Sequence, residues 1–223
     1  MFGLVGVIVL KAYVVISLHA TLWQMADQDA WEILGRIAEG QAGYVTTAQA
    51  EAVGIHRNSL RSQAHAGGRL ERAARGLYRL RFYPGSPFGP IAAAWVQTGP
   101  DLAVVSHESA LELYGLADVV PGQVHLTLPR QYRHRRPRRG VRLHRPRTPL
   151  LDTEVRRMHG LRTTTPERTL LDVLEAGTQP EQVERALQQA LQRALTTPAR
   201  IRRASERRSM TIRRQLERLL ATQ

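Results

Sequence analysis

The sequence predicts an α+β protein, with an N-terminal winged helix-turn-helix followed by a mixed α/β domain that has a helical C-terminus. Three observations lead to this fold class. A helix, a short turn, a second helix and a hairpin are expected in succession between residues 46 and 81. Clean alternation of apolar and polar residues predicts a strand over 124–128, with 141–144 as its partner. From residue 180 onward the chain is rich in Gln, Arg and Leu, which indicates helices broken once, at Pro198.

The N-terminal elements follow from capping residues and apolar spacing. The first helix is expected over 27–39, where apolar residues recur on one face. The second starts at the capping residues Thr46 and Thr47. The third begins near His56 and extends through His65, with Leu60 in its buried stripe. Two strands around a turn at Arg75 and Gly76 would form the wing.

The third helix carries the polar residues that suggest DNA binding. With Leu60 facing the core, Asn58, Ser62 and His65 fall on the opposite side and Arg61 flanks them. Asn can pair with adenine, and Arg with guanine, through two hydrogen bonds each. The residues expected to contact DNA are Thr47, Arg57, Asn58, Ser59, Arg61, Ser62, His65, Arg72 and Arg75.

Within this set, we expect Asn58 and Arg61 to contact bases, and Arg72 and Arg75 to hold phosphates or enter the minor groove. The imbalance of charge supports the phosphate contacts, because Glu71 is the only acid between residues 57 and 81. The alternative is a small helical hairpin with a polar outer face that never contacts nucleic acid.

Most of the positive charge lies in one segment. The net charge is +13, and residues 129–147 hold nine arginines and no acid. This segment is either a solvated loop between two strands or a second surface for operator phosphates or an RNA-bearing partner, because the guanidinium group binds phosphate through a planar fork. The arginines of that second basic surface would be Arg130, Arg133, Arg135, Arg136, Arg138 and Arg139.

Composition also sets the domain boundaries. Residues 1–24 are apolar, but Lys11 interrupts them and no positive region precedes them, so a wrongly assigned upstream start or an unstructured apolar leader is expected rather than a membrane anchor. We expect 25–82 to form the winged helix-turn-helix domain and 88–223 the α/β domain. Turn-forming residues around Pro84 separate the two. The absence of Cys excludes disulfides and thiolate chemistry.

Three features resemble catalytic or metal-binding patterns, and each has a simpler explanation. Residues Ser106–Glu108 contain the triad types, but neighbours at a helix start point in different directions and are not expected to form a hydrogen-bonded relay. The eight His residues lack metal-binding spacing. Asp172 and Glu175 share a helical face, where a solvated acidic edge paired with Arg168 is expected. The sequence therefore predicts no catalytic residue, no metal site and no cofactor.

Five segments, taken together in their order and spacing, carry a family resemblance: YVTTAQAEAVGI, RGLYRL, SHESALELYGL, VHLTLP and TTPERTLLDVLEAG. Over about 28–197 the chain resembles AbiEi-type antitoxins of type IV toxin–antitoxin systems. The resemblance implies a cytoplasmic transcriptional autorepressor that binds double-stranded operator DNA and has no membrane partner. It also implies that the C-terminal domain opposes a cognate nucleotidyltransferase toxin.

Two alternatives stay open. The first is a solitary transcriptional regulator. The second is a truncated relative of proteins whose similar N-terminal half continues into a restriction-endonuclease-like domain related to very-short-patch repair nucleases. That domain needs acid and Lys groups for metal-assisted hydrolysis. Because the sequence has no Lys after Lys11, the nuclease is the weaker alternative.

Overall fold

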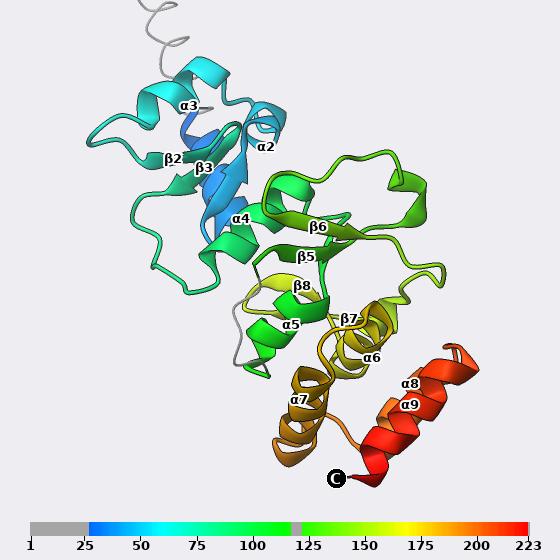
Figure 1. Cartoon of the computed structure of the whole chain (residues 1–223). Coiled ribbons are helices and arrows are strands. Elements are labelled where there is room, and N and C mark those ends of the chain that lie inside the picture. The colour runs from blue at the N-terminus through cyan, green and yellow to red at the C-terminus, as the bar shows by residue number, and fades with distance from the viewer. Residues whose placement is uncertain (1–26, 117–121, 223) are drawn as a thin grey trace, which may run out of the picture. The chain divides into compact units, whose positions relative to one another are not determined.

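The computed structural model describes residues 27–116 and 122–222, which divide after Pro84 into two compact units (Figure 1). The expectation for residues 1–24 lies outside the described residues. Within the described ranges, none of the helices combines the length and apolar character that a membrane span requires.

The N-terminal unit is a winged helix-turn-helix, which confirms the predicted fold. A helix over 27–39 is followed by β1 (Tyr44–Thr46), α2 (Thr47–Ala52), α3 (Arg57–Gln63), β2 (Leu70–Ala74) and β3 (Leu77–Leu80). The three strands form an antiparallel sheet in the order β1-β3-β2. The sequence did not predict β1, because its three residues are too short for an alternating pattern and depend on pairing with β3.

A capping box fixes the start of α2. The backbone N–H of Gln49 donates to Thr46 Oγ1 at 3.2 Å, and the Thr46 N–H donates to Gln49 Oε1 at 2.9 Å. These bonds satisfy donors that the first turn of a helix leaves free. The chain therefore turns from strand to helix at the predicted capping residue, Thr46.

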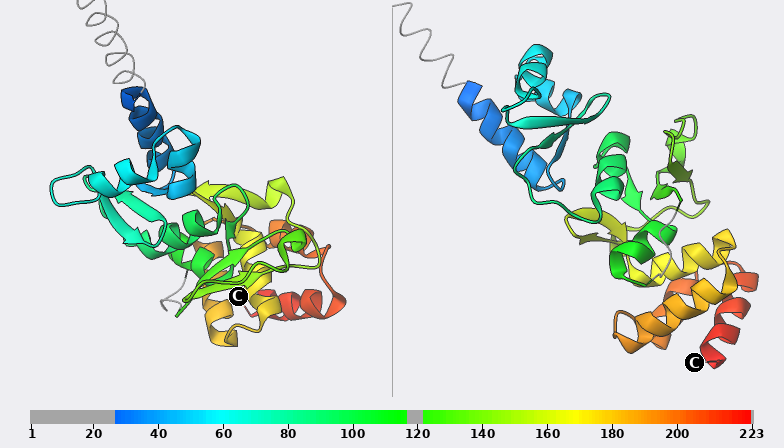
Figure 2. Two further views of the ribbon diagram at one scale, coloured as in Figure 1. Left: turned by 90° about the horizontal axis from the view of Figure 1, so that it is seen from above. Right: turned by 60° about the vertical axis from the view of Figure 1, so that its left-hand side comes forward.

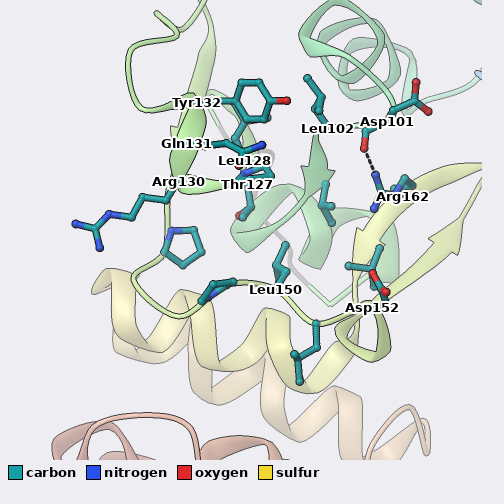
Figure 3. A pocket seen from close by; sticks show the side chains of 16 residues that line it. Asp101, Leu102, Thr127, Leu128, Arg130, Gln131, Tyr132, Leu150, Asp152 and Arg162 are labelled. Atoms are coloured by element: carbon teal, nitrogen blue, oxygen red, sulfur yellow. Dashed lines mark hydrogen bonds between the residues drawn. The ribbon is translucent and has the colours of Figure 1, made fainter.

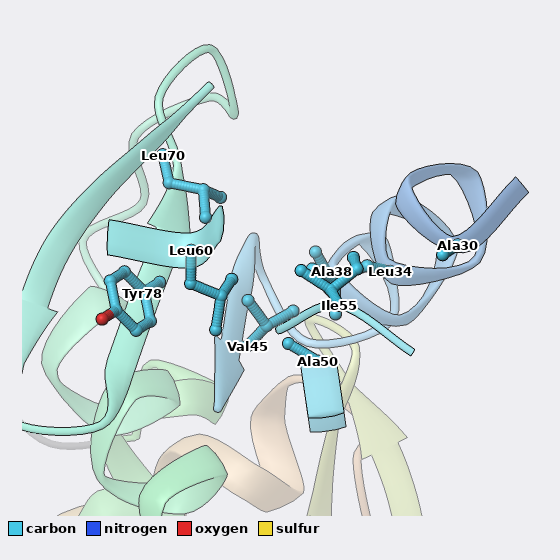
Figure 4. Close-up of a cluster of buried hydrophobic side chains, with 9 residues drawn as sticks. All are labelled: Ala30, Leu34, Ala38, Val45, Ala50, Ile55, Leu60, Leu70 and Tyr78. Carbon is cyan, nitrogen blue, oxygen red and sulfur yellow. The ribbon is translucent and has the colours of Figure 1, made fainter. Parts of the chain in front are cut away.

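One apolar cluster joins all elements of this unit (Figure 4). It consists of Ala30, Leu34, Ala38, Val45, Ala50, Ile55, Leu60, Leu70 and Tyr78. Leu34 and Leu60 are at most 1% exposed, and burial of one such side chain contributes about 1.5–3 kcal/mol relative to exposure. Because Leu60 lies in this core, the opposite side of α3 must face outward.

The C-terminal unit contains a mixed five-stranded sheet in the order β6-β5-β4-β8-β7. Its strands are β4 (Val104–Val105), β5 (Val124–Thr127), β6 (Val141–His144), β7 (Val155–Met158) and β8 (Leu161–Thr164). The predicted pairing of β5 with β6 is confirmed, and the two strands run parallel. Strand β7 was not predicted, because Arg156 and Arg157 break the alternation and both side chains lie exposed at the edge of the sheet.

Within the described residues of this unit, the helices are α4 (Gly89–Thr98), α5 (His107–Tyr114), α6 (Pro166–Ala176), α7 (Pro180–Gln192), α8 (Pro198–Ser205) and α9 (Met210–Ala221). Gly115 and Gly177 end α5 and α6 in the left-handed conformation, with φ of 64° and 73°. The prediction of a single break after residue 180 is wrong, since a second break precedes α9, where the Ser209 hydroxyl accepts a hydrogen bond from the Ile212 N–H. Figures 1 and 2 show α6–α9 grouped together.

Candidate nucleic-acid interface

Helix α3 presents a polar outer face. The His56 ring caps its start, with Nδ1 accepting from the Asn58 N–H at 3.2 Å. Arg57, Asn58, Arg61 and Ser62 are exposed, and Ser59 is half-buried. This face follows from the burial of Leu60, as the sequence predicted.

His65 lies outside α3, contrary to the predicted length of this helix. The helix ends at Gln63, and His65 is an exposed residue of the following turn. Gly68 explains the early end, because a Cβ atom there would lie 2.1 Å from the Gln63 carbonyl oxygen. The chain turns sharply against the last residue of the helix, and only Gly permits that approach.

The wing presents two free arginines. Arg72 and Arg75 are exposed on β2 and at the hairpin turn. Like Arg61, neither forms an ion pair or side-chain hydrogen bond with any described residue. The Thr47 N–H donates to the Gly76 carbonyl at 3.1 Å, which fastens the wing turn to the start of α2. Thr47 itself is half-buried.

Two other arginines of this unit hold the hairpin together. Arg79 pairs with Glu71 at 3.1 Å and donates to the carbonyls of Tyr83 and Pro84, each at 2.8 Å. Arg81 donates to three backbone carbonyls, those of Gly68, His65 and Leu70. The only acid between residues 57 and 81 is therefore already neutralised within the wing.

The six arginines of the proposed second basic surface, Arg130, Arg133, Arg135, Arg136, Arg138 and Arg139, are all exposed. None of them forms an ion pair with a described residue. Arg145 ties this segment to β6, since it donates to the carbonyls of Tyr132, Leu143 and Arg135. The hydrogen bonds of Arg145 therefore hold the backbone of this segment, and its six arginines present positive charge to solvent.

The triad-type residues make contacts that the sequence analysis did not foresee. His107 Nδ1 lies 2.9 Å from Ser106 Oγ, although neighbours were expected to point apart. The reason is that His107 adopts a φ of 51°, which is uncommon for a residue other than Gly. Glu108 pairs with His125 rather than His107, so the three residues do not form a linear relay. No group of three or more His, Asp or Glu side chains in the described ranges is placed to hold a metal ion.

Only part of the acidic edge of α6 is solvated, since Glu175 is exposed and Asp172 is buried. Asp172 is 4% exposed and pairs with Arg168 at 2.8 Å and with Arg208 at 2.6 Å. The prediction was correct for the Arg168 partner and for the exposure of Glu175, and wrong for the solvation of Asp172, because Arg208, which lies between α8 and α9, covers that residue. Local spacing in the sequence gives no sign of a contact with a residue so far along the chain.

Comparisons with known proteins agree with this architecture. A family model described as "Transcriptional regulator, AbiEi antitoxin" matches residues 32–81, and one described as "AbiEi antitoxin C-terminal domain" matches residues 103–222. No curated protein matches the chain. Among solved structures, the RV2827C protein from Mycobacterium tuberculosis has 20% sequence identity and a TM-score of 0.52, covering 86% of this chain and 76% of that one, which shows a shared fold. The two family models cover both units, and the chain belongs to the AbiEi antitoxin family of transcriptional regulators.

Proposed function

We propose that this protein is a cytoplasmic antitoxin that represses transcription of its own operon and opposes a cognate nucleotidyltransferase toxin. Residues 25–82 bind double-stranded operator DNA, and residues 88–223 carry the antitoxin role. The family models, one for each half of the chain, support this division. The role consists of binding and requires no catalytic residue or cofactor of this chain.

The observation that best supports DNA binding is the exposed polar face of α3, which the wing follows in the sequence. Asn58 and Arg61 are exposed, whereas Leu60, which lies between them in the sequence, is fully buried. The side chains that can pair with bases therefore face away from the core. Arg72 and Arg75 are free of internal acids and can neutralise phosphates. Base contacts on a helix and phosphate contacts on a wing together give a sequence-specific site.

Fluorescence anisotropy tests this role. The purified full chain is titrated with labelled DNA from upstream of its own gene and with a scrambled duplex of equal length. We expect tighter binding to the upstream DNA, by about 10³-fold or more at physiological salt. Equal affinity for both duplexes would contradict an operator-specific role.

We further propose that the second basic surface faces the toxin or the toxin's RNA target rather than the operator. Its six arginines belong to the C-terminal unit and have no acidic partners within the described ranges, while the wing has arginines of its own. A solitary regulator would need no such surface. Coexpression with a candidate nucleotidyltransferase toxin separates the two roles, since only an antitoxin restores growth.

A further inference from the structure

A second positively charged feature of the C-terminal unit is a cavity of about 370 Å³ beside β6 and α6. Five arginines line it: Arg142, Arg145, Arg147, Arg168 and Arg208. Only two acids, Asp172 and Glu175, share the lining. The size lies in the range of roughly 300–1,000 Å³ that is typical of small-molecule sites.

The acids compensate only part of this charge. Arg168 and Arg208 both pair with Asp172, and Arg208 also pairs with Glu175. Arg168 pairs in addition with Glu154, which lies outside the lining. Arg145 is occupied by backbone carbonyls, which carry no net charge. Arg142 and Arg147 are exposed and make no ion pair or side-chain hydrogen bond with any described residue. The cavity therefore has two free guanidinium groups and a surplus of positive charge.

Two stacked histidines form another part of the wall. The rings of His107 and His144 lie 3.5 Å apart between centroids. Burial lowers the pKa of both to about 3, so both are neutral at pH 7 and the cavity's charge comes from its arginines. His144 Nε2 and Asp172 Oδ2 are buried polar atoms without a hydrogen-bond partner in the described part of the chain. Such atoms are rare in folded proteins and often mark a place that a ligand or water completes.

A mainly apolar hollow of about 460 Å³ adjoins this cavity, and Thr127 and Pro146 line both. Its lining also includes the charged residues Asp101, Arg130, Asp152 and Arg162. Figure 3 shows Leu102, Leu128 and Leu150 directed into the hollow, with the ring of Tyr132 at its rim. A hydrophobic surface with an aromatic rim suits the organic part of a ligand, such as a planar base.

We propose that the arginine-lined cavity binds the phosphate group of a small phosphorylated molecule of nucleotide size, whose organic part lies in the adjoining apolar hollow. Guanidinium groups bind phosphate through two parallel N–H···O bonds, and Arg142 and Arg147 are free to do so. The proposal is independent of operator binding, because all of these residues belong to the C-terminal unit.

Isothermal titration calorimetry on the full chain tests this site with three probes: inorganic phosphate, ribose 5-phosphate and adenosine 5′-monophosphate. We expect the nucleotide to bind at least tenfold more tightly than inorganic phosphate, because only the nucleotide fills the apolar hollow. Equal affinity for the nucleotide and for phosphate would overturn the part played by the hollow. Absence of binding by all three probes would overturn the site.

A matched pair of double variants locates the binding. Arg142→Ser with Arg147→Ser removes the two free arginines of the cavity, while Arg138→Ser with Arg139→Ser removes the same charge from exposed positions outside it. The first variant should bind the nucleotide at least tenfold more weakly and the second within twofold of the original protein. All four side chains are exposed, so both variants should keep the melting temperature of the parent. Equal weakening in the two variants would show nonspecific attraction of the anion and overturn the proposal.

Discussion

At the scale of single residues, the arginines of the N-terminal unit divide by what they contact. Arg79 and Arg81 are committed to the hairpin, through Glu71 and through backbone carbonyls. Arg61, Arg72 and Arg75 have no partner among the described residues. Their uncompensated charge is available to DNA, whereas the charge of Arg79 is already neutralised.

Asn58→Ala and Arg61→Ala should each weaken operator binding by about 1–3 kcal/mol and change binding to random DNA little, because base contacts carry the specificity. Arg75→Ala should weaken binding to both DNAs, since a phosphate contact ignores sequence. Arg36→Ala is the matched control, because it removes an exposed arginine of the same unit outside the proposed interface. Anisotropy titrations measure each effect, and unchanged operator preference in both α3 variants would refute the assignment of this helix.

The Arg168 side chain is the most deeply buried charge of the α6 network. It is 2% exposed and pairs with Glu154 and Asp172. Arg168→Met should lower the free energy of unfolding by up to about 3–5 kcal/mol, because Asp172 and Glu154 each lose one of two arginine partners and keep only Arg208 and Arg207. Arg202→Met breaks an exposed pair with Glu217 and should cost at most about 1 kcal/mol. Urea denaturation compares the two, and equal costs would contradict the role given to burial.

The histidine pair predicts how stability responds to acid. His107 and His144 have pKa values lowered to about 3 by burial, whereas the unfolded chain binds these protons near pH 6.5. Between these values the unfolded state holds more protons, so stability is full above pH 6.5 and falls as the pH drops toward 3. Each His contributes a slope of up to about 1.4 kcal/mol per pH unit.

Groups packed around the pair modify this slope. His125, Glu108 and Arg142 act on both rings through their charges, and Arg168 acts on the His107 ring. The pKa of Glu108 is about 2, because hydrogen bonds from His125 and Thr178 outweigh its burial, which alone would raise it. Its contribution is therefore lost only in stronger acid, below pH 4.5. Denaturant midpoints between pH 7 and 4.5 should fall, and should fall less steeply in His144→Phe. An identical slope in that variant would mean that His144 is not the titrating group.

At the scale of elements, a capping residue correctly predicted where α2 starts. Thr46 was among the residues predicted to start α2, and the Thr46 hydroxyl does accept from the Gln49 N–H. Strands β1 and β7 were missed because pairing with their neighbours defines them, while their own side-chain patterns are short or broken. Local sequence patterns therefore predict an element correctly where the hydrogen bond that stabilises it joins residues close together in the sequence.

The segment over 129–140 carries the six arginines of the second basic surface, and the fold alone does not determine what this surface binds. Replacing Arg135, Arg136, Arg138 and Arg139 by Ser should abolish toxin neutralisation and leave the salt dependence of operator binding unchanged. If this segment instead contacts operator phosphates, the slope of log affinity against log salt should flatten by about one unit per lost contact. The double variant Arg72→Ser with Arg75→Ser is the positive control for a flattened slope. If toxin neutralisation and the salt slope are both unchanged, the segment is a solvated loop that contacts neither the toxin nor the operator.

At the scale of the whole molecule, the fold class and most elements follow from the sequence, but the cavity of the C-terminal unit does not. Its arginines come from β6, the segment after β6, α6 and the turn before α9. Arg142 and Arg208 lie far apart in the sequence, so no local motif identifies them as members of one site. The sheet and the packing of α6–α9 bring them together, and that arrangement depends on tertiary contacts rather than local propensity.

The roles proposed for the two units can be measured by the growth of cells that express a candidate nucleotidyltransferase toxin. The full chain should restore growth. A fragment of residues 25–82 should bind operator DNA but fail to restore growth, because it has a core of its own and lacks the entire antitoxin domain. A full chain carrying Asn58→Ala and Arg61→Ala should still restore growth when expressed from an independent promoter. Restored growth with the 25–82 fragment alone would contradict this division, since repression rather than the C-terminal unit would then protect the cell.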